Sequence, residues 1–257
     1  MDNVNKTLYI PLYGKALVSR KGLILADPKA EKIWAAGGFP LKGKSKSKWL
    51  AYYMAMRSRV FDRWVTEKTA QYPDAAVLHL GCGLDSRCLR VEHKGSWYDV
   101  DFPEVIAERK RFYGETPHYR MIGSDLRENW LDAISEKTAI VILEGVSMYL
   151  TRKELTAVLG KLAARFDRVY LLMDCYTEFA ARASKYKNPI NDVGVTQVYG
   201  LDDPELLRSS GLSFAQEHTM TPEDLIAQLP AMEQTLFRKL YAGKIARKMY
   251  RLYEYKK

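Results

Sequence analysis

The stretch Leu78-His79-Leu80-Gly81-Cys82-Gly83-Leu84-Asp85 decides the fold that we expect for this chain. A short apolar run over 75–80 leads directly into Gly-x-Gly, and a helix is expected after the turn, over 86–93. Glycine allows a sharp turn and a close approach between the backbone and a ligand. The third glycine of the dinucleotide fingerprint G-x-G-x-x-G is missing, which argues against a pyrophosphate at the helix start. Taken alone, the motif fits a plain tight turn as well as it fits a binding site.

Short apolar runs and helix-like stretches alternate along the chain downstream of this motif. Parallel strands joined by helices produce such alternation, and continuous apolar strands are typical of a sheet covered on both faces. We therefore expect an α/β fold with a mostly parallel sheet and right-handed crossovers. The expected strands cover 75–80, 97–100, 119–122, 138–143, 169–173 and 212–216, and the expected helices cover 86–93, 103–113, 127–134 and 151–165.

Helices are also expected near both ends of the chain. Asp27 and Pro28 fit an N-cap and the first helical position. Apolar spacing predicts long helices over 49–72 and 232–255. We expect a single domain of 257 residues. Its parts are an N-terminal helical cap over 1–72, a Rossmann-like core over 73–222 and a basic C-terminal helix over 223–257.

The composition is that of a globular protein with a basic excess. Hydrophobic residues make up 47% of the chain, and 40 Lys and Arg against 31 Asp and Glu give a net charge of +9, which favours anionic partners. No apolar run approaches the roughly 18 residues that span a membrane, and the N-terminus lacks the pattern of a signal peptide. Cys82, Cys88 and Cys175 lack C-x-x-C spacing, which predicts neither disulfides nor a metal site and favours a reducing, cytoplasmic location.

Acidic residues follow several of the expected strands. Asp101 comes at the end of the second strand, where a carboxylate can accept both hydroxyl hydrogens of a ribose; alternatively, it only caps the helix that begins near Phe102-Pro103. Asp125 could bind an adenine amino group, with Leu126 against the ring. Glu144 ends a buried strand, which is costly unless the carboxylate pairs with an arginine or lines a ligand crevice.

These features favour a nucleoside ligand without a phosphate tail. S-adenosylmethionine fits, because it combines ribose and adenine with a sulfonium and an amino-acid end. Carboxylates suit its cationic groups. Its own carboxylate needs a cation, for which the upstream helix offers Arg57 and Arg59.

Several blocks of sequence resemble one known family. The chain is similar to the leucine carboxyl methyltransferase family, which includes the tetracenomycin-type polyketide O-methyltransferases, over roughly residues 8–173. The blocks are Pro11-Leu12-Tyr13-Gly14-Lys15-Ala16, Asp27-Pro28-Lys29-Ala30, Met56-Arg57-Ser58-Arg59-Val60-Phe61-Asp62, Leu80-Gly81-Cys82-Gly83-Leu84-Asp85-Ser86-Arg87, Asp99-Val100-Asp101-Phe102-Pro103-Glu104-Val105, Ser124-Asp125-Leu126-Arg127 and Leu143-Glu144-Gly145-Val146-Ser147-Met148-Tyr149-Leu150.

The resemblance implies a class I Rossmann-like methyltransferase with a mostly parallel seven-stranded sheet and extra N-terminal helices. It implies S-adenosylmethionine as the cofactor and a carboxylate or phenolic hydroxyl as the methyl acceptor, on a polyketide-like small molecule or a C-terminal carboxylate. For the nucleoside, it implies that Asp101 holds the ribose and that Asp125 and Leu126 contact adenine. It implies that Tyr149 lies near the acceptor.

The resemblance also implies residues for the methionine end of the cofactor. Arg57 would bind its carboxylate, with Lys15 as a weaker second cation, and Gly81 would pass beside it. Glu144 would lie near the amino group or the sulfonium. His79 stands where the wider class often has an acid, which leaves binding of the amino group more dependent on Glu144.

The chemistry of the acceptor remains open at this stage. A carboxylate is ionised at pH 7 and needs no base, whereas a phenol, with a pKa near 10, would benefit from one. His118 and His218 are the candidate bases, although a lone histidine is more often structural. Tyr149, Tyr176 and Tyr186 are candidates for the acceptor pocket, although aromatic residues after strands are more often packing residues.

A competing interpretation comes from the basic C-terminal segment. Residues 236–257 carry eight Lys and Arg against one acid, Glu254, with tyrosines interleaved. Such a segment could bind nucleic acid on a degenerate nucleotide-binding fold, or an acidic membrane surface. We favour an amphipathic helix whose apolar side packs while its cations stay in water. The basic run 42–48 likewise reads as a solvated entrance to the site, or as a contact for an anionic acceptor.

Overall fold

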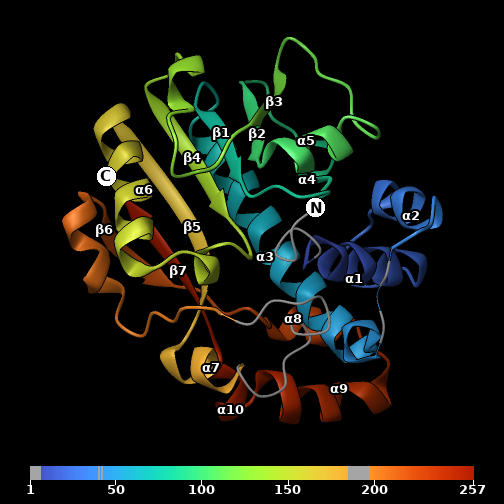
Figure 1. Cartoon of the computed structure of the whole chain (residues 1–257). Coiled ribbons are helices and arrows are strands. Elements are labelled where there is room, and N and C mark those ends of the chain that lie inside the picture. Colours follow the sequence, from blue (N-terminus) through green and yellow to red (C-terminus); the bar gives the residue numbers. More distant parts are fainter. Residues whose placement is uncertain (1–6, 40, 42, 185–196) are drawn as a thin grey trace.

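A seven-stranded sheet forms the centre of the computed structural model, which describes residues 7–39, 41, 43–184 and 197–257 (Figure 1). The strand order is β3-β2-β1-β4-β5-β7-β6. All pairs are parallel except those of β7, which runs antiparallel to both β5 and β6. The mostly parallel sheet that the sequence predicts is confirmed. The strands are β1 (Ala76–Leu80), β2 (Trp97–Asp101), β3 (Tyr119–Gly123), β4 (Thr138–Leu143), β5 (Arg168–Tyr176), β6 (Ser213–Glu217) and β7 (Tyr250–Lys256).

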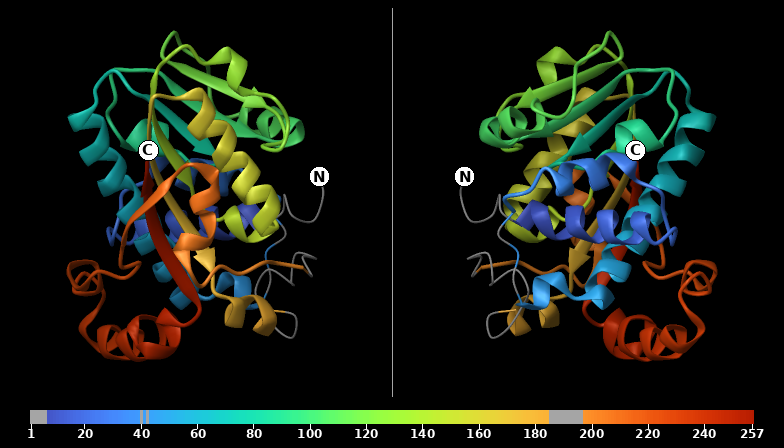
Figure 2. Two further views of the ribbon diagram at one scale, coloured as in Figure 1. Left: turned by 90° about the vertical axis from the view of Figure 1, so that its left-hand side faces the viewer. Right: turned by 90° about the vertical axis from the view of Figure 1, so that its right-hand side faces the viewer.

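Helices cover both faces of the sheet, as the unbroken apolar strands predict (Figure 2). On one face, alternate strand residues such as Leu78 and Val141 pack against α6. On the other face, Val77 and Ile140 pack in one core with α3. The helices are α1 (Tyr9–Arg20), α2 (Pro28–Ala35), α3 (Lys48–Gln71), α4 (Arg87–Arg90), α5 (Pro103–Arg109), α6 (Arg152–Arg165), α7 (Glu178–Ala183), α8 (Glu223–Ile226), α9 (Ala231–Phe237) and α10 (Lys244–Arg247).

Local sequence signals account for several helix starts. Asp27 is the N-cap of α2, because its side chain accepts a hydrogen bond from the Ala30 N–H, and Pro28 occupies the first turn. Thr151 and Glu154 form a capping box at the start of α6. None of the helices in the described parts of the chain is long and apolar enough for a membrane span.

Two expected helices are much shorter than predicted, and a third, expected over 103–113, ends at Arg109. The stretch 86–93 contains only the single-turn helix α4, and the stretch 127–134 contains only a 3₁₀ turn over Leu131–Ala133. In the first, the Asp85 side chain accepts the Arg87 N–H, and Arg87 and Arg90 turn inward to carboxylates. These polar contacts, rather than an apolar stripe, fix the segment, so the helical period does not continue.

The predicted C-terminal helix over 232–255 is wrong, and so is the assignment of 223–257 to a basic helix. The segment forms α9, a π-helical turn over Arg238–Ala242 and α10, and then becomes β7. The backbone is extended at Gly243, where the helical pattern breaks. The tyrosines Tyr253 and Tyr255 are buried between β5 and β6, where β-favouring aromatic residues pack on a sheet. The division of the chain into a cap and a core stays a prediction.

Candidate active site

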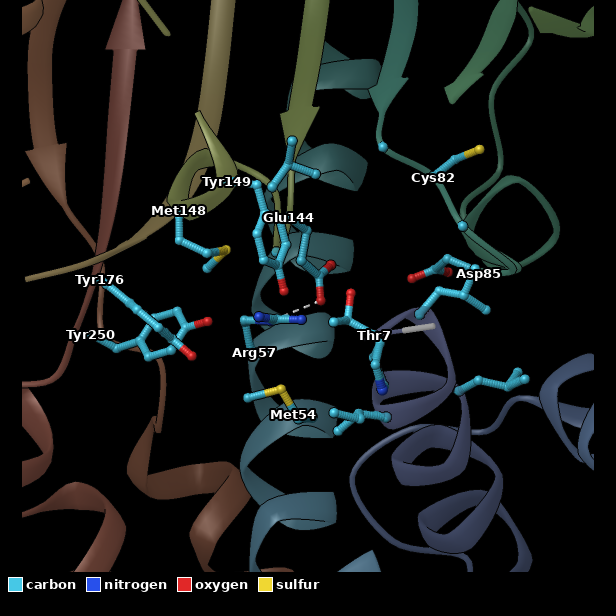
Figure 3. Close-up of a pocket in the computed structure, with 18 of the residues that line it drawn as sticks. Thr7, Met54, Arg57, Cys82, Asp85, Glu144, Met148, Tyr149, Tyr176 and Tyr250 are labelled. Carbon is cyan, nitrogen blue, oxygen red and sulfur yellow. Dashed lines mark hydrogen bonds and ion pairs between the residues drawn. The ribbon is translucent and has the colours of Figure 1, made fainter. Parts of the chain in front are cut away.

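A cavity of about 790 Å³ lies beyond the carboxyl ends of β1 to β5 (Figure 3). In doubly wound sheets, ligands bind where the strand order reverses. Here the reversal falls between β1 and β4, because the chain passes from β1 to β2 and β3 on one side and then returns to β4. The cavity is lined by every residue that the sequence assigned to the site, namely Lys15, Arg57, Gly81, Asp101, Asp125, Leu126, Glu144 and Tyr149.

The glycine turn after β1 brings the backbone to the cavity in a conformation that favours glycine. Gly81 has a φ of +68° and Gly83 a φ of +52°. A Cβ atom on Gly81 would lie 2.2 Å from Cγ2 of Val146. The side chain of Val146 therefore occupies the space that a larger residue would need, so packing within the protein already requires glycine at position 81.

Asp101 lies at the end of β2 and lines the cavity. Its Oδ2 accepts the Gly83 N–H at 2.7 Å, and its Oδ1 accepts the Phe102 N–H at 2.8 Å. Burial raises the pKa of Asp101 to about 6, although these two N–H groups and Arg109 act against the rise. Asp101 thus fixes the glycine turn and the start of α5 together. Each of its carboxylate oxygens has a second lone pair with which to accept from a ligand.

Asp125 and Leu126 follow β3 at the edge of the cavity. Asp125 is held by Arg127, whose Nη2 lies 2.6 Å from Oδ2 and whose Nε lies 3.0 Å from Oδ1. The hydrogen bonds from Arg127 lower the pKa of Asp125. Leu126 is buried in the core against the α6 face of the sheet. A carboxylate and an apolar side chain therefore lie side by side, at the end of the cavity formed by β2 and β3.

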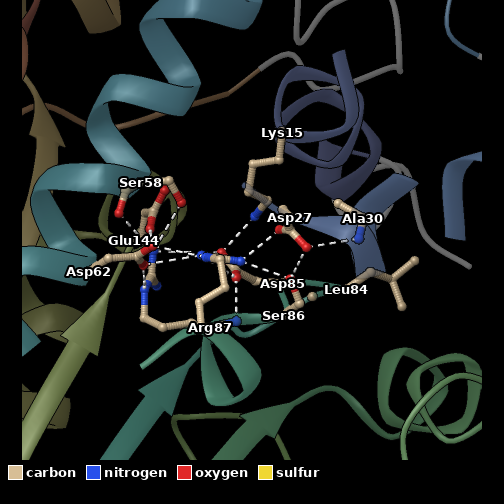
Figure 4. A network of polar contacts seen from close by, with 12 residues as sticks. Lys15, Asp27, Ala30, Ser58, Asp62, Leu84, Asp85, Ser86, Arg87 and Glu144 are labelled. Atoms are coloured by element: carbon tan, nitrogen blue, oxygen red, sulfur yellow. Dashed lines mark hydrogen bonds and ion pairs between the residues drawn. The ribbon is translucent and has the colours of Figure 1, made fainter. Parts of the chain in front are cut away.

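A group of nine charged side chains, eight of them buried, lies beneath the glycine turn, and we call it the charge network (Figure 4). Four of its members are basic and five are acidic. Arg87, which is fully buried, is its centre, because it pairs with carboxylates from α3, from the loop after β1 and from the turn after β4. The members are Lys15, Asp27, Arg57, Asp62, Asp85, Arg87, Arg90, Glu144 and Asp174.

Glu144 both pairs with arginine and lines the cavity, so the two possibilities that its sequence position left open are both realised. Arg57 Nε lies 3.0 Å from Oε1, and Arg87 Nη2 lies 2.5 Å from Oε2. Burial alone would raise the pKa of Glu144, but Arg87 and Arg57 outweigh it, so the pKa lies below its usual value. Glu144 is therefore a carboxylate at neutral pH, with one side toward the cavity.

Arg57 has a second partner deep in the sheet. Its Nη1 donates to Oδ2 of Asp174 at 2.8 Å, while Oδ1 of Asp174 accepts the Gly145 N–H at 2.6 Å. Burial opposes ionisation of Arg57, but Asp174 and Glu144 outweigh it and raise the pKa of the guanidinium. Arg59, the other cation that the sequence offers on this helix, does not line the cavity.

Lys15 and His79 both reach the cavity, and both already have partners in the protein. Lys15 Nζ lies 2.6 Å from Oδ2 of Asp85, an acid that also lines the cavity. His79 lies between Asp99, 3.4 Å from its Nδ1, and Arg87, 3.3 Å from its Nε2. Burial lowers the pKa of His79, so the ring is neutral. A neutral ring can donate to Asp99 and accept from Arg87, which are roles inferred from the partners.

The half of the cavity beside β5 and β7 is lined by tyrosine and methionine. Figure 3 shows Met148, Tyr176 and Tyr250 on one side of Arg57, Cys82 and Asp85 on the other, and Tyr149 beside Glu144 between them. The rings of Tyr176 and Tyr250 meet edge to face with centroids 4.6 Å apart. Burial raises the pKa values of Tyr149 and Tyr250, so these phenols stay protonated.

Neither histidine that the sequence offered as a base lines the described cavity. His118 is exposed just before β3, at the opposite end of that strand from the cavity. His218 follows β6 and pairs with Glu254 of β7 at 2.7 Å. Tyr186 lies outside the described residues. Within those residues, no group of three or more His, Cys, Asp and Glu side chains could hold a metal ion.

Apart from Asp27, which the sequence places as an N-cap, the sequence analysis assigns no role to five members of the charge network. They are Asp62, Asp85, Arg87, Arg90 and Asp174. Asp174 carries the signal that identified Glu144, since it follows four apolar residues in a buried strand. An acid after a buried apolar run is the signal that could have identified Asp174. Arg87 and Arg90 are local partners of Asp85, but its third partner, Lys15, could not be predicted locally, because it is 70 positions away.

The sheet order, the glycine turn and the acids at the strand ends define a class I methyltransferase fold. Magnesium protoporphyrin IX methyltransferase from Synechocystis PCC 6803, solved with bound S-adenosylhomocysteine, has this fold with a TM-score of 0.54 at 15% identity. The match covers 90% of this chain and 93% of that one. The model of the family "Leucine carboxyl methyltransferase" matches residues 4–163.

Two curated relatives point to the same family. The tetracenomycin polyketide synthesis O-methyltransferase TcmP of Streptomyces glaucescens is 30% identical over 241 residues, which cover 91% of this chain and 89% of that protein. The S-adenosyl-L-methionine-dependent methyltransferase dpfgK of Gibberella zeae is 26% identical, over 65% of this chain and 62% of its own length. This chain belongs to the leucine carboxyl methyltransferase family, as its sequence motifs predict.

Proposed function

We propose that this chain is an S-adenosylmethionine-dependent O-methyltransferase that acts on a small, largely apolar acceptor. One observation carries the proposal: acidic groups line one half of a single cavity and tyrosines the other, with Arg57 and Glu144 between the halves. The family membership and the activities in the relatives' names support it. A cytoplasmic location stays a prediction, for which the three free cysteines are the argument.

The acidic half suits the nucleoside. Asp101 would accept both ribose hydroxyls with the lone pairs that Gly83 and Phe102 leave unused. Asp125 would accept from the adenine amino group, and Leu126 would lie against the ring. Because Arg127 already holds Asp125, the carboxylate is pre-oriented and has lost much of its rotational freedom before a ligand arrives.

The charge network suits the amino-acid end of the cofactor. It contains four cations and five carboxylates, which leaves one negative charge in excess. S-adenosylmethionine carries one net positive charge, from its sulfonium, ammonium and carboxylate. Arg57 and Lys15 would bind its carboxylate beside Gly81, and Glu144 would accept from its ammonium. Bound there, the cofactor would supply an electrophilic methyl group with a neutral thioether as its leaving group.

The tyrosine half suits the acceptor, and we favour a carboxylate over a phenol. Tyr149, Tyr176 and Tyr250 offer hydroxyl groups and apolar rings. Among the described residues that line the cavity, His79 is the one histidine; its Nε2 lies against Arg87, and its Nδ1 lies 3.4 Å from Asp99. A carboxylate is already a nucleophile at neutral pH, so the protein needs only to orient it and exclude water.

The nucleic-acid-binding alternative depended on tyrosines that could stack on bases. The tyrosines that were to stack on bases include Tyr253 and Tyr255, which are buried in β7. None of the relatives that we compared is named as a nucleic-acid-binding protein.

Calorimetry combined with product analysis tests the proposal. We expect saturable binding of S-adenosylmethionine and S-adenosylhomocysteine. Mass spectrometry should then detect a 14 Da gain on members of a panel of aromatic carboxylic acids, and a weaker gain or none on the matching phenols. Salt-dependent binding of an oligonucleotide without binding of either nucleoside would overturn the proposed function.

A further inference from the structure

Asp174 of β5 is a buried acid that touches the proposed cofactor site only through other residues. Its side chain is 0% exposed, and it is not among the residues that line the cavity. Both carboxylate oxygens are nevertheless used, one by the guanidinium of Arg57 and the other by the backbone N–H of Gly145. Both partners do line the cavity.

These contacts form a closed ring of interactions in the wall of the cavity. Arg57 donates to Asp174 through Nη1 and to Glu144 through Nε. Glu144 is joined by its peptide bond to Gly145, whose N–H returns to Asp174. One rigid carboxylate thus determines the orientation of the guanidinium and the course of the turn that carries Glu144.

The backbone of that turn explains why the ring needs an anchor. Gly145 has a φ of +73°, and a Cβ atom there would lie 3.4 Å from Nη2 of Arg57. The hydroxyl of Ser147 also donates to the main-chain oxygen of Asp174 at 2.5 Å. The turn is therefore tied to β5 at two points, both on Asp174.

We propose that Asp174 is a positioning residue for cofactor binding, which holds Arg57 and Glu144 in one fixed arrangement suited to the carboxylate and ammonium of an amino-acid ligand. The inference rests on the proposed function. Without the charge on Asp174, Arg57 would have Glu144 as its remaining anionic partner, and the two would neutralise each other instead of each facing a ligand group of opposite charge.

The test compares ligands that share the nucleoside and differ in the amino-acid end. Asp174→Asn keeps the shape of the side chain, but its one oxygen can accept from Arg57 or from Gly145, not from both. We expect calorimetry to show S-adenosylhomocysteine binding at least about tenfold more weakly to this variant, with the affinity for adenosine changed less than about twofold. Equal losses for the two ligands would mean a general structural role and would overturn the proposal.

A double-mutant cycle with Glu144→Gln sharpens the test. If Asp174 acts through the ring, Asp174→Asn should weaken S-adenosylhomocysteine binding less than about twofold once Glu144 is already neutral; additive losses would contradict the inference. Should Asp174→Asn fail to fold, Ser147→Ala removes only one tie and should weaken S-adenosylhomocysteine binding about two- to threefold without changing adenosine binding. If the unchanged protein binds neither S-adenosylmethionine nor S-adenosylhomocysteine, the proposed function itself fails.

Discussion

The two halves of the cavity differ in how their polar groups are held. Beside β1, β2 and β3, the lining carboxylates Asp85, Asp101 and Asp125 are each fixed by backbone N–H groups or basic side chains. Beside β5 and β7, tyrosines and methionines dominate the lining, with rings packed on one another. The first half is rigid and charged, which suits a ligand shared by a whole family. The second is neutral and deformable, which suits an acceptor that differs between members.

The largest effect is expected from the centre of the acidic half. Asp101→Ala should weaken S-adenosylmethionine binding at least about 100-fold, because two hydrogen bonds to a charged group, each worth about 1.5–3 kcal/mol, are lost. Calorimetry measures the change. Tyr176→Phe, in the other half, is the matched control and should leave this affinity within about twofold. Binding that survives Asp101→Ala would break the division of the cavity into two functional halves.

The pH dependence of cofactor binding tests the proposed role of Asp101 in a second way. The pKa of Asp101 is about 6 in the free protein, so the carboxylate gains a proton as the pH falls through 6. The protonated form has a hydroxyl where ribose needs an acceptor. Affinity for S-adenosylmethionine should therefore fall about tenfold between pH 7 and pH 5, since the loss follows the ionised fraction. The same titration of Asp101→Asn should be flat over this range, and a parallel fall in the variant would assign the effect to another group.

The sequence predicts the acidic half better than the tyrosine half, for a physical reason. Parallel strands present their carboxyl ends at one edge, so Asp101, Asp125 and Glu144 could be placed together from strand positions alone. The tyrosine half depends on β7, an antiparallel strand that pairs with residues about eighty positions earlier in the chain. The residues of β7 carry no local sign of that pairing, and the spacing of Met249 and Leu252 continues the helical pattern of Leu236 and Leu240 into the strand. Gly243, which interrupts this spacing, was the one local signal against a single long helix.

A smaller effect is expected in the tyrosine half. Tyr149→Phe removes a hydroxyl whose hydrogen bond is worth about 1 kcal/mol, so kcat/KM for the acceptor should fall about fivefold. Because Tyr149 is not expected to touch the nucleoside, the dissociation constant of S-adenosylhomocysteine should stay within about twofold. Steady-state kinetics and calorimetry on the same preparation separate the two quantities. A change confined to cofactor affinity would mean that Tyr149 contacts the cofactor rather than the acceptor. The proposed division of roles between the two halves would then be wrong.

The smallest effect is expected from a substitution of His118. The size of this effect distinguishes a carboxylate acceptor from a phenol in the tyrosine half. His118→Gln should leave kcat/KM within about twofold across pH 6 to 8, because the side chain is exposed before β3 and does not line the cavity. A carboxylate acceptor loses no proton, so its turnover should not follow a group with a pKa near 6.5. If the variant instead removed an alkaline-side rise in turnover, a histidine would be acting as a base. The acceptor would then be a phenol, and the conformation with His118 outside the cavity would not be the catalytic one.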